Sequence, residues 1–276
     1  MNKLRQIFKF LGRLFHKAVP CSPKVDGSPI APICFTENFH FINKPDNGKT
    51  LFKLYDYQKR MMEAFVNHRE VVCVAPRQMG KTSVALAYIL WYALMHPNKN
   101  IVIVAHNATS ISNLVSHIKF AYENCTAPLL PRMERCVERL LKFDNGSEIS
   151  VQTDMSLAGR MNDIDLVYYD ELAVNRTPKA LEQWMKNYPI LRNTTKIIVA
   201  STPYSTEDVC HYIWKGANGY ADEFGNVLGG STNRENGFFA VSVKWREHPE
   251  RDEKWLKTRW NRYTKPLQRE IECLYT

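Results

Sequence analysis

Residues 71–83 read Val-Val-Cys-Val-Ala-Pro-Arg-Gln-Met-Gly-Lys-Thr-Ser. The first five are an apolar run rich in valine, the middle is a loop that closes on Gly80-Lys81-Thr82, and an apolar helical pattern begins at Val84. A strand, a loop and a helix in this order form the context of a phosphate-binding loop. The stretch therefore predicts that the phosphates of a nucleotide bind here.

The chemistry of such a loop depends on backbone amides and two side chains. Successive loop N–H groups and the helix N-terminus attract phosphate oxygens. Lys81 would reach the β- and γ-phosphates, and the Thr82 hydroxyl would bind Mg²⁺. The usual pattern Gly-x4-Gly-Lys-[Ser/Thr] lacks its first glycine, and an arginine stands inside the loop. The predicted nucleotide contacts of the loop are Ala75, Pro76, Arg77, Gln78, Met79, Gly80, Lys81 and Thr82.

Three further apolar runs, at 101–105, 166–169 and 196–200, alternate with helical patterns. Strands that alternate with helices predict an α/β fold with a mostly parallel central sheet flanked by helices. Each run, like the strand before the loop, is followed by polar residues: His106-Asn107, Asp170-Glu171 and Ser201-Thr202. Ligands of open α/β sheets bind beyond the carboxyl ends of the strands. We therefore expect these polar ends to converge on one site.

Asp170 and Glu171 are the acidic half of the expected site. Asp170 would hold Mg²⁺, because hard cations prefer carboxylate oxygens. Glu171 would orient and polarise an attacking water, since phosphoryl transfer needs positioning more than covalent chemistry. The hydroxyls of Ser201 and Thr202 would sense the γ-phosphate, although an ordinary turn that opens a helix has the same Ser-Thr-Pro pattern.

Two more candidates lie outside these strand ends. Tyr57 would stack on adenine and Gln58 would bind its edge, although a helix with one buried tyrosine explains the pair equally well. Arg160 lies in a polar loop before the Asp-Glu strand, where a solvated surface arginine is the simpler interpretation.

Composition limits the functional class. The net charge of +9 suits a polyanionic partner such as nucleic acid. Seven scattered cysteines without a Cys-x-x-Cys spacing predict free thiols, not a zinc site or a disulfide framework. No apolar run reaches about 18 residues, so we expect no transmembrane span. We divide the chain into a basic amphipathic helix with a proline-rich linker (1–52), a core that carries the phosphate-binding loop (53–215), and a C-terminal part (216–276) with a mobile loop at 216–237 and helices at about 252–263 and 266–275.

Together these motifs resemble the ATPase domain of the large terminase subunit, the DNA-packaging motor of tailed bacteriophages. The resemblance runs from about Leu54 to the C-terminus and depends on the order and spacing of all the motifs. The matching stretches are Tyr57-Gln58 as the adenine motif, Arg77 to Thr82 as a deviant Walker A, Val104-Ala105-His106, Asp144 to Ser147, Asp170-Glu171 as Walker B with the catalytic glutamate, Ala200 to Pro203 as the coupling motif, and Trp245 to Pro249.

The resemblance implies a P-loop NTPase of the additional-strand catalytic-glutamate type with a small C-terminal lid subdomain. It implies ATP and Mg²⁺ as cofactors and Glu171, Arg77 and Arg160 as catalytic residues, Arg160 being offered to a neighbouring subunit. The implied partners are double-stranded DNA without sequence preference, the portal protein, the small terminase subunit and further copies in a ring, all in the host cytoplasm. Large terminases continue into a nuclease domain near the point where this chain ends, so we expect no nuclease activity from it.

Two other functions stay open. A helicase-like DNA translocase would need a second motor domain, for which few residues are left. A nucleotide-gated DNA-binding module that does not turn over ATP would have no need of the base Glu171.

Overall fold

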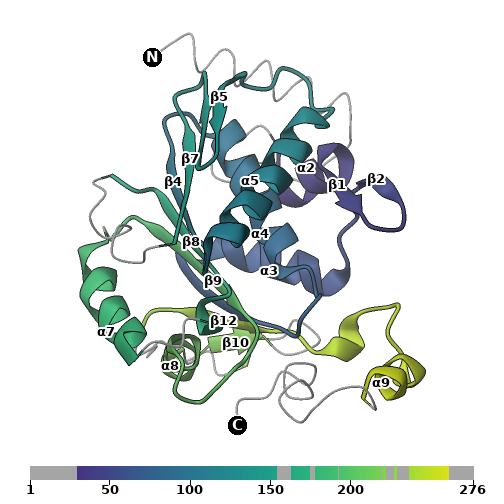
Figure 1. Ribbon diagram of the computed structural model, residues 1–276, viewed down its shortest axis with the longest axis vertical. Coiled ribbons are helices and arrows are strands. Elements are labelled where there is room, and N and C mark those ends of the chain that lie inside the picture. Colours follow the sequence, from purple (N-terminus) through teal and green to yellow (C-terminus); the bar gives the residue numbers. More distant parts are fainter. Residues whose placement is uncertain are drawn as a thin grey trace.

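The computed structural model describes residues 30–153, 163–174, 178–191, 193–217, 219–221, 227–228 and 236–260. Its largest feature is a ten-stranded sheet with helices on both faces (Figure 1). The strands are β3 (Glu70–Val74), β4 (Asn100–Val104), β5 (Met133–Val137), β6 (Leu140–Phe143), β7 (Glu148–Gln152), β8 (Leu166–Asp170), β9 (Lys196–Ser201), β10 (Gly219–Ala221), β11 (Val227–Leu228) and β12 (Phe239–Ser242). The order across the sheet is β11-β10-β12-β3-β9-β8-β4-β7-β6-β5.

The strands from β10 to β7 in this order run parallel, and the antiparallel pairs involve β11, β6 and β5 at the two edges. The prediction of a mostly parallel α/β sheet is confirmed. The four strands with polar ends, β3, β9, β8 and β4, are neighbours, so their carboxyl ends meet at one edge of the sheet. Strand β9 lies between the loop strand β3 and the acidic strand β8, as the additional-strand type of NTPase requires.

Each central strand is buried on both faces, which explains its uninterrupted apolar sequence. Alternate residues of β3 belong to two separate cores: Val71 and Cys73 pack on one face, Val72 and Val74 on the other. The helices are α2 (Pro32–Phe39), α3 (Asp56–Asn67), α4 (Lys81–Met95) and α5 (Ala108–Glu123) on the first face, α7 (Pro178–Asn187) and α8 (Val209–Gly216) on the second, and α9 (Glu253–Trp260) beyond the sheet (Figure 1).

The segment expected to be a linker is folded from residue 30 onward. Helix α2 is followed by a hairpin of β1 (Phe41–Lys44) and β2 (Gly48–Leu51), which are paired antiparallel. Phe35, Phe39 and Phe52 of this segment belong to the core that contains α4. The linker interpretation is therefore wrong for residues 30–52, because the aromatic side chains there have apolar surface to cover. The basic helix expected at the N-terminus lies outside the described residues.

Two other expectations need correction. Residues 216–237 were expected to be a mobile loop, but β10 and β11 of this segment join the sheet edge. Cys73, Cys125, Cys136 and Cys210 are free thiols, as expected, whereas Cys34 is disulfide-bonded. The helix expected at 266–275 lies outside the described residues. Among the helices of the described ranges, none is long and apolar enough to cross a membrane.

Candidate functional site

The loop between β3 and α4 turns sharply at two residues with left-handed backbone. Gln78 has φ of +61° and Gly80 has φ of +74°, and Gly80 is the N-cap of α4. A Cβ at Gly80 would lie 2.6 Å from Nε2 of Gln58, so glycine is also required sterically. The first N–H groups of a helix have no partner within it. The start of α4 therefore presents amide donors where phosphate oxygens would lie.

Lys81 is buried, with 4% of its surface exposed, and its ammonium is held by oxygen atoms. Its Nζ donates to the carbonyls of Ala75 and Pro76 at 3.1 Å each and to Oγ1 of Thr202 at 2.8 Å. The carboxylate of Glu171 lies 3.5 Å from the same nitrogen. The cation thus lies between the loop and the end of β9, where an incoming phosphate could replace some of these oxygens.

Asp170 ends strand β8 and contacts the first turn of α4. Its Oδ1 accepts hydrogen bonds from Oγ1 of Thr82 at 2.9 Å and from the hydroxyl of Tyr168 at 2.6 Å. Burial raises the pKa of Asp170 above its ordinary value. A bound cation would offset this cost of burying the charge, since Mg²⁺ sites often use one carboxylate, a hydroxyl and substrate phosphates. The residue types and the contact of Asp170 with Thr82 fit a magnesium site.

Glu171 leaves the strand direction at the next position. Its φ of +52° is uncommon for a residue other than glycine, and its N–H donates to the carbonyl of Ala200 at 2.9 Å. Its Oε2 accepts from the N–H of Thr202 at 3.1 Å. The Glu171 carboxylate thus lies between Lys81 and the end of β9.

Ser201 and Thr202 are both buried, and both are linked to the residues that directly follow β8. The N–H of Ala173 donates to Oγ of Ser201 at 3.0 Å, while Thr202 contacts Lys81 and Glu171 as described. The structure therefore brings together Lys81, Thr82, Asp170, Glu171, Ser201 and Thr202 at one edge of the sheet. These contacts join the loop, β8 and β9 into a single polar cluster.

Residues 72–274 match the family described as "Terminase large subunit, T4likevirus-type, N-terminal". The matched stretch is well over half of the 276 residues. This chain belongs to that large terminase family. The resemblance of the motifs is confirmed, and so is the P-loop NTPase fold.

Solved large terminases have a similar fold. The ATPase domain of the Thermus phage P74-26 large terminase is 18% identical, with a TM-score of 0.59, over 82% of this chain and 95% of that chain. A large terminase from a thermophilic bacteriophage, solved in complex with ADP, is 12% identical, with a TM-score of 0.57, over 81% of this chain and 54% of that chain. The bacteriophage HK97 large terminase is 15% identical, with a TM-score of 0.56, over 82% of this chain and 46% of that chain. This chain therefore spans about half the length of the last two proteins.

The adenine motif of this terminase chain lies beside the loop, but its groups are engaged within the protein. Tyr57 is 1% exposed, and its ring lies 5.8 Å from that of Tyr55 and 6.2 Å from that of His248. Gln58 donates to the carbonyl of Met79 at 3.2 Å and accepts from the N–H of Tyr55 at 3.0 Å. In this structure the pair supports the loop, and its contact with adenine stays a prediction.

Of the two predicted catalytic arginines, only Arg77 lies among the described residues. Arg77 is exposed within the loop, next to the buried Pro76. Arg160 lies outside the described residues, so its role stays a prediction.

Sequence reasoning missed two residues of the site. Tyr168 donates to Asp170, and its position two residues before Asp170 on the same strand face was a usable signal. Arg251 donates to the carbonyl of Gln78 at 2.8 Å and to the sulfur of Met79 at 3.0 Å. It approaches the loop from 173 positions further along the chain, a distance that no local pattern reveals.

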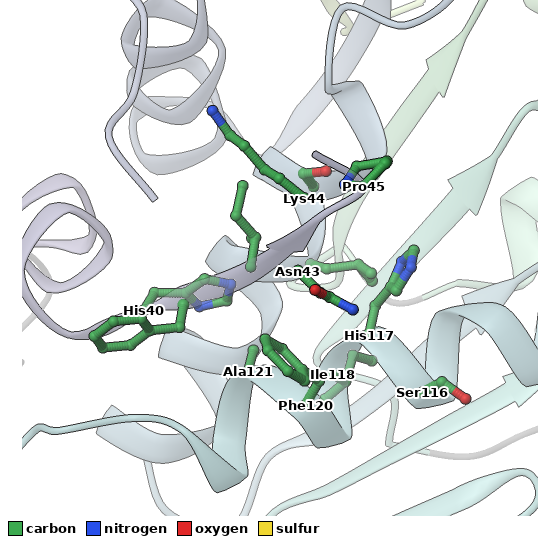
Figure 2. Close-up of a pocket in the computed structure, with 13 residues that line it drawn as sticks. His40, Asn43, Lys44, Pro45, Ser116, His117, Ile118, Phe120 and Ala121 are labelled. Carbon is green, nitrogen blue, oxygen red and sulfur yellow. The ribbon is translucent and has the colours of Figure 1, made fainter. Parts of the chain in front are cut away.

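A cavity of about 430 Å³ lies on the face of the sheet that α4 and α5 cover, between β1, α4 and α5. Figure 2 shows His40 and Asn43 of the hairpin segment facing His117, Phe120 and Ala121 of α5. Ser83, which directly follows Thr82, forms part of its wall. The cavity thus borders the first turn of α4 without including the predicted phosphate contacts.

Proposed function

We propose that this chain hydrolyses ATP at the shared edge of β3, β8 and β9, and that hydrolysis drives double-stranded DNA into a procapsid. The single observation that carries the proposal is the polar cluster itself. Lys81, the contact of Thr82 with Asp170, and the contact of Glu171 with Thr202 lie where the loop amides would hold a triphosphate. Membership of the large terminase family supports the coupling to DNA packaging.

The residues of the site act in a defined order. Lys81 exchanges loop carbonyls for β- and γ-phosphate oxygens, and Asp170 and Thr82 would hold Mg²⁺. When bound, Mg²⁺ neutralises charge that develops on the phosphates. Glu171 then orients the attacking water, as a base positioned within hydrogen-bond reach. Because Thr202, which directly follows β9, contacts both Lys81 and Glu171, it senses whether the γ-phosphate is present.

Arg77 stabilises charge on the γ-phosphate from within the loop, and Arg160 does so from a neighbouring subunit of a ring. The basic protein holds DNA through phosphate contacts that do not depend on sequence. The C-terminal segment that contains α9 serves as a lid on an ATPase core that also includes β10, β11 and β12. Portal protein and small subunit are the packaging partners, and the motor works in the host cytoplasm.

Steady-state ATP hydrolysis by wild type, Glu171→Gln and Lys81→Ala tests the proposal. We expect Glu171→Gln to lose roughly 10²–10⁴-fold in turnover, the range of general-base catalysis, while it still binds ATP. Lys81→Ala should lose ATP binding itself. Equal slow rates for wild type and Glu171→Gln would instead identify a nucleotide-gated module that does not turn over ATP.

A further inference from the structure

Tyr168 is a buried residue whose hydroxyl contacts the carboxylate that would hold magnesium. Its side chain is 0% exposed, and its hydroxyl donates to Oδ1 of Asp170 at 2.6 Å. The two residues share one face of β8, because side chains of a strand alternate between faces. This hydroxyl therefore reaches Asp170 from the interior of the sheet, with no water needed between them.

The two oxygens of Asp170 have different surroundings. Oδ1 accepts from both Tyr168 and Thr82, whereas Oδ2 accepts no hydrogen bond from the described part of the chain. One oxygen is thus fixed by the protein while the other is left for a cation. Groups that orient a ligand in this way commonly affect metal affinity as strongly as some ligands do.

Thr82 alone cannot fix this carboxylate in the same way. Its hydroxyl lies on α4, beside the loop, and its oxygen would itself bind the metal. The Tyr168 hydroxyl belongs to the rigid strand that also carries Asp170, and it would not be a metal ligand. It is the donor that would keep the carboxylate orientation constant whether or not a nucleotide is bound.

We propose that Tyr168 is a positioning residue that holds Asp170 in the rotamer needed for magnesium. The proposal rests on the ATPase function proposed above. Tyr168→Phe retains the ring and removes only the hydroxyl, so it separates this role from core packing. Tyr169→Phe is the matched control: Tyr169 is 1% exposed on the adjacent position, and its ring packs on the other face of the sheet, 5.2 Å from Trp184.

The experiment titrates Mn²⁺ into the full chain with ATPγS and follows free Mn²⁺ by electron paramagnetic resonance. We expect Tyr168→Phe to bind Mn²⁺ roughly 10–100-fold more weakly, the usual effect of removing a group that orients a metal ligand, and Tyr169→Phe to stay within about twofold of wild type. In ATPase assays, Tyr168→Phe should need proportionally more Mg²⁺ for half-maximal rate and regain most of its turnover at saturating Mg²⁺.

Three outcomes would overturn the inference. Tyr168→Phe could bind Mn²⁺ as wild type does, the two phenylalanine variants could lose affinity equally, or lost turnover could fail to return with Mg²⁺. Thermal unfolding of each variant shows whether a lost affinity reflects a less stable fold. If Tyr168 acts through Asp170, adding Tyr168→Phe to an Asp170→Asn variant should cause no further loss of Mn²⁺ affinity. A wild-type chain that neither binds nor hydrolyses ATP would remove the proposed function first and the inference with it.

Discussion

Gly80 lies at the turn into α4 with φ of +74°, and Nε2 of Gln58 stands 2.6 Å from where a Cβ would lie. We expect Gly80→Ala to destabilise the fold by about 1–2 kcal/mol, the cost of a left-handed backbone in an L-residue, before any steric contact is counted. It should also displace Gln58 from the Met79 carbonyl and weaken ATP binding. Chemical denaturation and nucleotide titration measure the two effects.

The double variant with Gln58→Ala separates the two causes of the Gly80 effect. Shortening Gln58 removes the steric contact and leaves the backbone cost, so the two substitutions should not be additive. Strictly additive losses would show that Gln58 does not restrict position 80, and our interpretation of the loop would be wrong at that point.

At the residue level, the sequence identified the polar strand ends because each follows an apolar run directly. Tyr168 was overlooked, although the alternation of side chains along a strand places it, two positions before Asp170, on the same face as that carboxylate. The sequence could not show that the ring of Tyr57 is covered by Tyr55 and His248, because His248 lies far away in the sequence. Local chemistry is therefore readable from the motif, whereas contacts between distant segments are not.

At the level of elements, the segment from the 3₁₀ helix η3 (Trp245–Glu247) to α9 is tied to the phosphate loop. Arg251 donates to the carbonyl of Gln78, and its guanidinium lies 4.6 Å from the ring of Trp255 near the start of α9. The residue thus connects the loop to the segment proposed as a lid.

We expect Arg251→Ala to weaken ATP binding by about 3–10-fold, since a hydrogen bond contributes roughly 0.5–1.5 kcal/mol and Arg251 makes more than one contact. Amide exchange in 245–260 should become faster and lose its dependence on nucleotide. Arg246→Ala is the matched control, because Arg246 pairs with Glu253 at 3.1 Å and stacks on Trp245. Equal effects of both variants would contradict a specific link between Arg251 and the loop.

The elements that sequence reasoning misjudged have a common physical cause. Prolines were taken as signs of a linker, yet Pro32 stands in the first turn of α2, where its missing N–H costs nothing, and Pro45 lies in the turn between β1 and β2. The hairpin at Asp144 to Ser147 was predictable, because Asn-Gly favours such turns and the flanking strands β6 and β7 alternate. Turn residues thus marked real turns, but they did not tell a linker from a packed segment.

At the level of the whole molecule, residues 30–52 pack against the rest of the protein through buried side chains, and one of these side chains, His40, is ionisable. His40 is 3% exposed, lines the cavity of Figure 2, and its Nδ1 has no hydrogen-bond partner among the described residues. Burial lowers the pKa of His40 from about 6.5 to about 4. The folded protein therefore keeps this imidazole neutral at a pH where the unfolded chain protonates it.

The sign of the resulting pH dependence follows from linkage. Well above pH 6.5 both states are neutral at His40, so its contribution to the free energy of unfolding is fully present. As the pH falls from about 6.5 to 4, the unfolded state gains a proton and the folded state does not, which removes up to roughly 3 kcal/mol of stability.

We expect His40→Gln to flatten this part of the curve of stability against pH. Urea denaturation between pH 7 and 5, where most carboxylates stay ionised, measures the effect. His117→Gln, on the exposed side of the same cavity, should leave the wild-type slope unchanged. If His40→Gln kept that slope, the N-terminal segment would not be held to the core by a neutral buried histidine.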